Sequence, residues 1–307
     1  MAPKRTPKKG PRSASGNRVD PERMEAAAKE SVAGLKERIE EGRRASGTFR
    51  AIVEDALPRH ANDDDIGDFS WALTEDAKLL QHGGPRADFR STDTWRVMRI
   101  MSEFIEGFDK LANVEKGVSI FGSARTHPDD PQYIAATETA RLLGEKGFSI
   151  ITGAGPGIME AANKGAKLAG APSIGCNIEL PFEQGTNPYV DTAVAFRYFA
   201  VRKTMFIKYS SAFIIFPGGF GTFDELFEAL TLIQTGKISQ FPVVLFGTHY
   251  WAGLVRWLNS RVLAERKISP GDMDLMVVTD DPAEAARVVE QAFELQLRTA
   301  RLRAEKK

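Results

Sequence analysis

The sequence predicts an α/β domain of the doubly wound (Rossmann-like) class, in which helices cover both faces of a parallel sheet. From Gly117 onward, short runs rich in Val, Ile and Phe alternate with segments of helix-forming residues. These runs are apolar throughout rather than at every second position, which is typical of strands buried on both faces. A chain of 307 residues has room for one such domain and appended segments.

Seven apolar runs give the expected strands, and six segments give the helices that follow them. The strands are expected at 118–124, 148–154, 172–178, 193–199, 212–218, 242–247 and 275–280. The helices are expected at 131–146, 157–169, 200–209, 222–235, 251–265 and 282–304. Strands that alternate with helices pair in parallel, and folds of this class bind ligands beyond the carboxyl ends of their strands. We therefore expect the chemistry in the loops that follow the strands.

The first 90 residues lack this alternation. Residues 1–20 hold six basic side chains against one acidic one and are rich in Pro, Ser and Gly, which predicts a disordered basic tail. For residues 21–90 we expect an extension, with a helix over 21–45 and then an acidic linker that is broken by Pro and Gly and carries a short helix or two. A stronger helix, expected at 92–113, opens the predicted domain of residues 91–307.

Composition excludes several classes of protein. Lys and Arg number 41, Asp and Glu also 41, and 42% of residues are hydrophobic, values that do not fit a disordered chain, a collagen or a coiled-coil rod. No apolar run reaches the roughly 18–20 residues of a membrane span, and no apolar segment follows the basic N-terminus, so we expect a soluble cytoplasmic protein without a secretory signal. The basic tail has no aromatic residues for base stacking, so we expect no nucleic-acid partner.

The cysteine and histidine residues do not predict a metal site. Cys176 is the single cysteine, so the chain forms no internal disulfide, and its apolar strand predicts a core position. The four histidines match no ligand spacing, and we expect neither a metal nor a cofactor.

Three expected strands end in loops of glycine and small residues, at 121–125, 152–160 and 216–225. Glycine lets a ligand approach the backbone closely, and the helix after each loop directs free N–H groups and the positive end of its dipole toward it. An anion, most simply a phosphate, is the expected occupant. No Walker sequence is present. Gly153–Gly157 has the spacing Gly-x-Gly-x-Gly rather than Gly-x-Gly-x-x-Gly, so a nicotinamide cofactor paired with Glu179 stays open only as a weak alternative.

The third loop, Pro217–Glu225 (PGGFGTFDE), resembles the PGGxGTxxE signature of the Lonely guy (LOG) family, phosphoribohydrolases of cytokinin riboside monophosphates that are often labelled lysine decarboxylases. Arg202-Lys203 is similar to the family's Arg-Lys helix. Gly153–Met159 resembles its GGGPGIM loop, with Ala154 in place of a glycine. The resemblance covers about residues 117–283. No lysine stands in a recognisable pyridoxal phosphate setting, so the decarboxylase label has no support in the residues.

The resemblance implies roles for particular residues. Arg202 and Glu225 would be catalytic. The implied substrate contacts are Glu183, Lys203, Gly218, Gly219, Phe220, Gly221, Thr222, Asp224 and Thr231, to which the glycine loops themselves add Ser123, Gly153, Gly155 and Gly157. A carboxylate stabilises the cationic sugar formed when an N-glycosidic bond breaks, or orients water, and a permanent cation can stabilise the departing base.

Two functional hypotheses follow. The first is a hydrolase that cleaves a purine nucleoside 5′-monophosphate, with adenine or an N6-substituted adenine as the base, into free base and ribose 5-phosphate. The alternative is a carrier of a nucleotide or of the molybdenum cofactor without turnover. The family resemblance and the apolar helices at 92–113 and 222–235 lead us to expect a homodimer or a larger homo-oligomer. In the simpler structural interpretation, Glu225 is only an acid favoured by the helix dipole, Arg202 is a surface charge, and Phe196, Tyr198 and Phe199 belong to the core.

Overall fold

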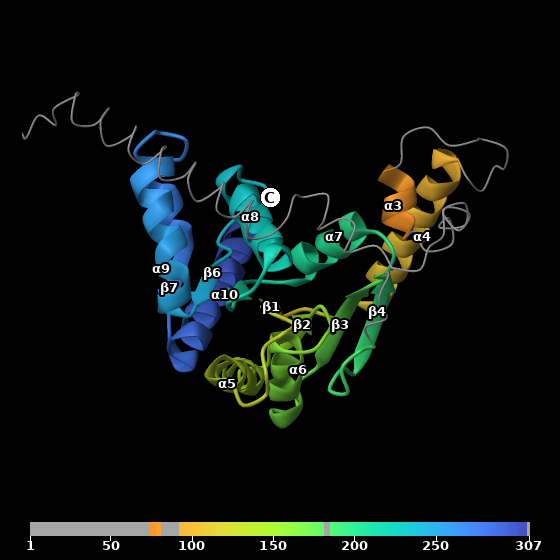
Figure 1. Ribbon diagram of the computed structural model, residues 1–307, viewed down its shortest axis with the longest axis horizontal. Coiled ribbons are helices and arrows are strands. Elements are labelled where there is room, and N and C mark those ends of the chain that lie inside the picture. The colour runs from red at the N-terminus through yellow and green to blue at the C-terminus, as the bar shows by residue number, and fades with distance from the viewer. Residues whose placement is uncertain (1–73, 81–91, 181–184, 306–307) are drawn as a thin grey trace, which may run out of the picture. The chain divides into compact units, whose positions relative to one another are not determined.

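The computed structural model describes residues 74–80, 92–180 and 185–305, all within one compact unit that spans Trp71–Lys307 (Figure 1). The predicted basic tail at 1–20 and the helix at 21–45 lie outside the described residues, as does Glu183.

The described residues form one parallel seven-stranded sheet, which confirms the predicted class of fold. Its order is β4-β3-β2-β1-β5-β6-β7, and every neighbouring pair is parallel. The strands are β1 Gly117–Phe121, β2 Ser149–Thr152, β3 Ser173–Ile178, β4 Thr192–Phe196, β5 Phe213–Ile215, β6 Val243–Phe246 and β7 Met276–Thr279. Each matches a predicted apolar run, although the strands are shorter than the runs because the last residues of most runs turn into the following loop.

The α-helices agree with the prediction except after β6. They are α3 Glu75–Leu80, α4 Asp93–Lys110, α5 Pro131–Glu145, α6 Ile158–Leu168, α7 Phe199–Tyr209, α8 Phe220–Gln234, α9 Thr248–Trp257 and α10 Pro282–Glu305. The helix expected at 251–265 is in fact α9, which starts earlier, followed by one π-helical segment at Leu258–Leu263. A short 3-10 helix at Pro270–Leu275, whose first turn is capped by Ser269 and Asp272, was not predicted.

Helices cover both faces of the sheet, and each face has its own apolar core. Helices α5, α6 and α10 pack on one face, where Val118, Ile120 and Ile150 are fully buried. Helices α7, α8 and α9 pack on the other, with α4 beside α7. Figure 1 shows α5 and α6 on the side of the sheet opposite to α7 and α8. No helix in the described part of the chain is both long and apolar enough to cross a bilayer.

The order of the strands reverses direction between β1 and β5, which are neighbours in the sheet although three other strands lie between them in the chain. The loops that follow these two strands therefore leave the same edge side by side. The amide N–H of Ser123 donates to the carbonyl of Pro217 at 2.9 Å and joins them directly. Such a reversal opens a crevice for ligands in open α/β sheets.

Candidate active site

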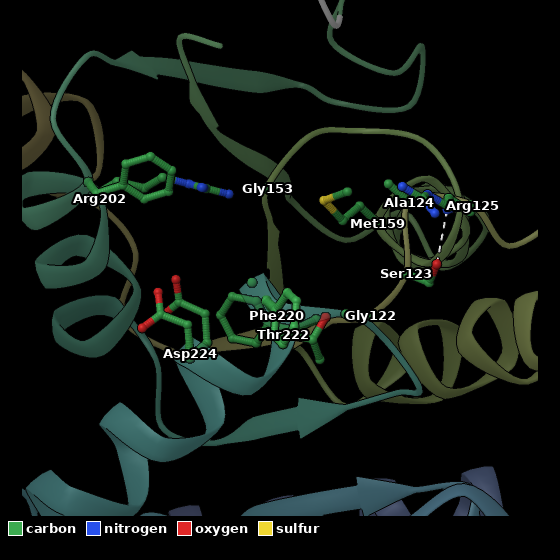
Figure 2. A pocket seen from close by; sticks show the side chains of 15 residues that line it. Gly122, Ser123, Ala124, Arg125, Gly153, Met159, Arg202, Phe220, Thr222 and Asp224 are labelled. Carbon is green, nitrogen blue, oxygen red and sulfur yellow. Dashed lines mark hydrogen bonds between the residues drawn. The ribbon is translucent and has the colours of Figure 1, made fainter. Parts of the chain in front are cut away.

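A cavity of about 610 Å³ opens at this reversal point (Figure 2). The loops after β1 and β2 form one wall, and the first turns of α7 and α8 form the other. The cavity is lined by Phe121, Gly122, Ser123, Ala124, Arg125, Gly153, Met159, Phe199, Arg202, Gly219, Phe220, Gly221, Thr222, Asp224 and Glu225. The site residues predicted from the sequence that lie among them are Ser123, Gly153, Arg202, Gly219, Phe220, Gly221, Thr222, Asp224 and Glu225.

The carbonyl groups of the loop between β5 and α8 accept hydrogen bonds from other groups of the protein. The carbonyl of Pro217 accepts from Ser123, that of Gly218 accepts from the Tyr250 hydroxyl at 2.6 Å, and that of Gly219 accepts the Thr222 amide at 2.9 Å. Among the described residues, the N–H groups of Gly218–Gly221 find no acceptor. Unpaired amides at the start of a 15-residue helix are suited to binding an anion, and for that reason we call this segment the anion-binding loop.

Gly218 shapes this loop, although it does not line the cavity. A β-carbon at Gly218 would lie 2.1 Å from the Thr222 hydroxyl oxygen, so a side chain at this position would displace Thr222. The glycine therefore allows the threonine hydroxyl to stand beside the free amides.

Glu225 lies in the second turn of α8 with its carboxyl group withdrawn from solvent. The residue is 5% exposed, and its Oε2 has no hydrogen-bond partner among the described residues. Burial raises the pKa of Glu225 to about 7, against the opposing effect of the nearby positive charges of Lys203 and Arg202. A buried carboxyl oxygen without a partner is costly for folding, and such strongly shifted groups concentrate at functional sites.

Arg202, in the first turn of α7, reaches into the cavity toward Gly153 (Figure 2). Its Nε donates to the carbonyl of Cys176 at 2.9 Å, and its guanidinium lies 5.1 Å from the ring centre of Phe206. In the described structure no carboxylate lies within ion-pair distance of it. Burial lowers the pKa of Arg202, while the charge of Glu225 opposes that shift. Among the residues that the structure describes, Arg202 is thus a cation without an ion-pair partner, and a backbone carbonyl holds its side chain in place.

Gly153 explains how the guanidinium fits. A β-carbon at this position would lie 2.5 Å from Nη2 of Arg202 and 2.9 Å from the sulfur of Met159. The absence of a side chain at Gly153 is what leaves room for the cation.

Lys203 and Thr231 lie outside the main cavity. Lys203 follows Arg202 on the helix and so points about 100° away from it. Its ammonium group bonds Asp224 at 2.9 Å and Glu228 at 3.0 Å, and although burial opposes the shift, these contacts raise the pKa of Lys203. Together with Thr231 it lines a separate shallow depression on α8. The structure therefore does not bring Lys203 and Thr231, both predicted substrate contacts, to the cavity. Asp224 lines both the cavity and this depression.

Gly155 and Gly157 also lie outside the lining of the cavity. The carbonyl of Gly155 accepts from the Asn187 side-chain amide at 3.0 Å. Gly157 has a φ of +67°, and a β-carbon there would lie 2.3 Å from the carbonyl oxygen of Ser123. Gly157 therefore shapes the loop by adopting a positive φ and by allowing a close backbone approach.

A buried polar network under that loop was missed by sequence reasoning. The Thr152 hydroxyl donates to the Asn163 side chain at 2.6 Å and accepts the Ala154 amide at 2.9 Å. The Asn187 amide donates to Asn163 at 2.9 Å, and Asn163 donates to Ser173 at 2.8 Å. Isolated polar residues in a sequence give no signal of such a network, because its members lie far apart along the chain.

Sequence reasoning also missed lining residues. Phe199, expected in the core, is 40% exposed because it is the first residue of α7 and borders the cavity. Cys176, Phe196 and Tyr198 are buried, as predicted. Arg125 lines the wall opposite Arg202, and its guanidinium makes no ion pair within the described chain. The described residues contain no group of three His, Cys, Asp or Glu that could hold a metal ion.

Fold and site together define an α/β protein with an anion-binding loop, a buried carboxyl group and an unpaired arginine at its topological switch point. A sequence profile of the family described as "Possible lysine decarboxylase" matches residues 159–289, and the chain belongs to this family.

Two relatives carry the names of nucleotide-cleaving enzymes. The chain is 28% identical over 177 residues to the pyrimidine/purine nucleotide 5′-monophosphate nucleosidase of Escherichia coli K12, an alignment that covers 54% of this chain but only 39% of that enzyme. It is 29% identical over 154 residues to the cytokinin riboside 5′-monophosphate phosphoribohydrolase of Mycobacterium tuberculosis, covering 50% of this chain and 82% of the relative.

Among solved structures, the molybdenum cofactor carrier protein of Chlamydomonas reinhardtii superposes with a TM-score of 0.45 at 26% identity, over 58% of this chain and 98% of that one.

Proposed function

We propose that the protein hydrolyses the N-glycosidic bond of a nucleoside 5′-monophosphate and releases the free base and ribose 5-phosphate, with adenine or an N6-substituted adenine as the base. The observation that carries this proposal is the buried Glu225, whose unpartnered carboxyl oxygen belongs to the same cavity as the unpaired Arg202 and the free amides of the loop before α8. The names of the relatives support the same class of reaction.

The chemistry assigns a role to each charged group. As the bond between C1′ and the base nitrogen breaks, positive charge develops on the ribose, and the Glu225 carboxylate stabilises it and orients a water molecule for attack on C1′. The water loses a proton to the carboxylate and its oxygen bonds to C1′. The base leaves with the electron pair of the broken bond, and Arg202 stabilises the negative charge that develops on it. The base then takes up a proton from solvent, and Glu225 returns to solvent the proton that it took from water.

In this proposal the phosphate of the substrate binds at the loop before α8, which lines the same cavity. The amides of Gly219–Gly221 and the Thr222 hydroxyl offer hydrogen-bond donors without a partner among the described residues, and the α8 dipole favours negative charge there. Arg125 adds a cation from the neighbouring loop, which is bonded to this one through Ser123. Lys203, in contrast, is already paired with two carboxylates.

The test is to incubate the protein with AMP, N6-substituted AMP and the pyrimidine monophosphates, and to measure released base by chromatography. We expect release from the purine nucleotides, and its loss in Glu225→Gln and Arg202→Ala. Glu290→Gln, which removes a surface carboxylate paired with Lys146 on the far face, is the matched control. If the wild-type protein binds nucleotides tightly and releases no base from any of them, the enzyme proposal is wrong and the carrier alternative stands.

We also propose that the chain assembles as a homodimer or a larger homo-oligomer. Helix α4 exposes Val97, Met98, Met101 and Ile105, and α8 exposes Phe220 and Phe227. Val97, Met101 and Ile105 are four residues apart and so lie along one face of α4, and an exposed apolar face of this kind is typical of protein–protein contacts.

A further inference from the structure

The helix that carries Arg202 has no cap within its own sequence. Its N-cap residue is Tyr198, whose side chain makes no capping hydrogen bond, and the first turn of α7 contains no acidic residue. The first N–H groups of a helix need acceptors, and the positive end of the dipole favours a nearby carboxylate. The acceptors at this helix come from elsewhere in the chain.

Glu103 of α4 supplies the first of them. Its two carboxyl oxygens accept the backbone amide of Arg197 at 3.2 and 3.1 Å, and one also accepts the amide of Tyr198 at 3.3 Å. Glu103 is 4% exposed, so its carboxyl group is withdrawn from solvent, and its bond to the Tyr198 amide is buried. Asp76 of α3 accepts the amide of Phe199, the next residue along the chain, at 2.9 Å. Three consecutive backbone amides, those of the two residues before α7 and of its first residue, are thus held by two carboxylates 94 to 123 positions away in the sequence.

An independent contact presses α4 against α7 further along the helix. Gly107 is buried on α4, and a β-carbon there would lie 2.9 Å from the terminal methyl carbon of Met205 and 3.2 Å from the ring of Phe196. The Tyr209 hydroxyl also donates to the carbonyl of Phe108 at 3.3 Å. The two helices therefore meet at both ends of α7, and a side chain at position 107 would have to displace the end of the Met205 side chain.

The cavity depends on the position of that first turn. Phe199 is the first residue of α7 and Arg202 the fourth, and both line the cavity. A shift of the turn by about 1 Å would break the 2.9 Å bond from Arg202 to the Cys176 carbonyl. Helices α3 and α4 lie outside residues 159–289, the part that the family profile matches.

We propose that Glu103, assisted by Asp76, is a positioning residue that holds the first turn of α7 and so places Arg202 and Phe199 at the cavity. This inference rests on the proposed function, and it gives the segment before β1 a part in the active site.

The test compares Glu103→Gln with Glu106→Gln, which removes a solvent-exposed carboxylate of α4 that is paired with Lys110. Glutamine has the shape of glutamate but lacks the charge and one of the two acceptor oxygens. We expect the kcat for base release to fall about tenfold in Glu103→Gln and to stay unchanged in Glu106→Gln, with both proteins folded by circular dichroism. An unchanged kcat in Glu103→Gln would overturn the proposal.

A double-mutant cycle separates positioning from general stability. If Glu103 acts through Arg202, then Glu103→Gln should cost far less activity in an Arg202→Lys background than in the wild type. If the two losses simply multiply, Glu103 has only a structural role and the proposal is wrong. The same cycle on AMP affinity, measured by calorimetry, tests the coupling even if the wild-type protein releases no base, so failure of the hydrolase proposal is distinguishable. Glu103→Asp, which keeps the charge on a shorter arm, replaces Glu103→Gln if the glutamine variant does not fold.

Discussion

The surroundings of Glu225 raise the pKa of its carboxyl group to near neutral pH. Because burial raises the pKa of this carboxyl group to about 7, Glu225 is ionised in half of the molecules at that pH. The ionised form is the one that stabilises a cationic sugar. We expect kcat/KM for AMP to rise about tenfold per pH unit below pH 7 and to level off above it. A pH–rate series measures this. A rate that falls above pH 7 would instead show that protonated Glu225 acts as the acid.

The same group should limit stability. A carboxyl pKa that is higher in the folded than in the unfolded protein makes ionisation unfavourable for folding, so the cost is absent below the unfolded value near 4.5 and complete above about 7. Glu225→Gln should therefore raise the free energy of unfolding at about pH 8, by up to about 3 kcal/mol. The gain should shrink toward about pH 5. Urea titrations at the two pH values measure it, and an equal gain at both would contradict the assigned cause.

Gly153 should be required for activity rather than for folding. In Gly153→Ala the new methyl group collides with the guanidinium of Arg202, which is flexible enough to move away and leave its productive position. We expect base release to fall by about 100-fold while the melting temperature changes little. Gly253→Ala on α9, where a β-carbon meets no atom within 4 Å, is the control that should keep full activity.

At the scale of single residues, the sequence predicted the groups that stand within a continuous motif. Glu225, Thr222 and the glycines before α8 belong to one short segment, and the structure brings most of them to the cavity. Phe199 and Glu103 could not be found in that way. Their positions depend on where α7 begins and on its contact with α4, both consequences of tertiary packing.

At the scale of elements, each predicted strand is present because a strand buried on both faces leaves a strong apolar run. The segment after β6 was predicted less well. Apolar spacing identifies a helix there, but it cannot distinguish an α-helix from the π-helical segment that follows Trp257, since that segment has only six residues. The polar network beneath the loop after β2 left no periodic pattern at all.

That network should stabilise the loop that carries Gly153. Thr152→Val keeps the shape of the side chain but leaves the backbone amide of Ala154 and the side-chain carbonyl oxygen of Asn163 with one partner fewer, both in the interior. We expect the free energy of unfolding to fall by about 1–3 kcal/mol. Chemical denaturation measures it. Thr137→Val, whose hydroxyl donates to a carbonyl of its own helix α5, should cost much less, and equal losses would mean that the network is not special.

At the scale of the whole molecule, the exposed face of α4 should mediate self-association. Met101 and Ile105 are 58% and 67% exposed on a helix that is anchored to the domain by its other side. We expect light scattering to give at least twice the monomer mass, and the double variant Met101→Glu/Ile105→Glu to reduce it to that of a monomer. Leu168→Glu, at an exposed leucine of α6, should leave the mass unchanged. A wild-type protein that is monomeric at micromolar concentration would refute the proposed oligomer.

The reversal of strand order between β1 and β5 means that the cavity belongs to neither half of the chain alone. Ser123, Gly153 and Met159 come from the β1–β4 half, whereas Glu225 and the anion-binding loop come from the half that begins with β5. A bound nucleotide would therefore work as a non-covalent cross-link across the central seam of the sheet. At about 100 times its dissociation constant it would contribute about 2.7 kcal/mol against separation of the halves. The concentration of the nucleotide would then affect how long the folded protein lasts in the cell, because the bound nucleotide bridges the two halves that meet at β1 and β5.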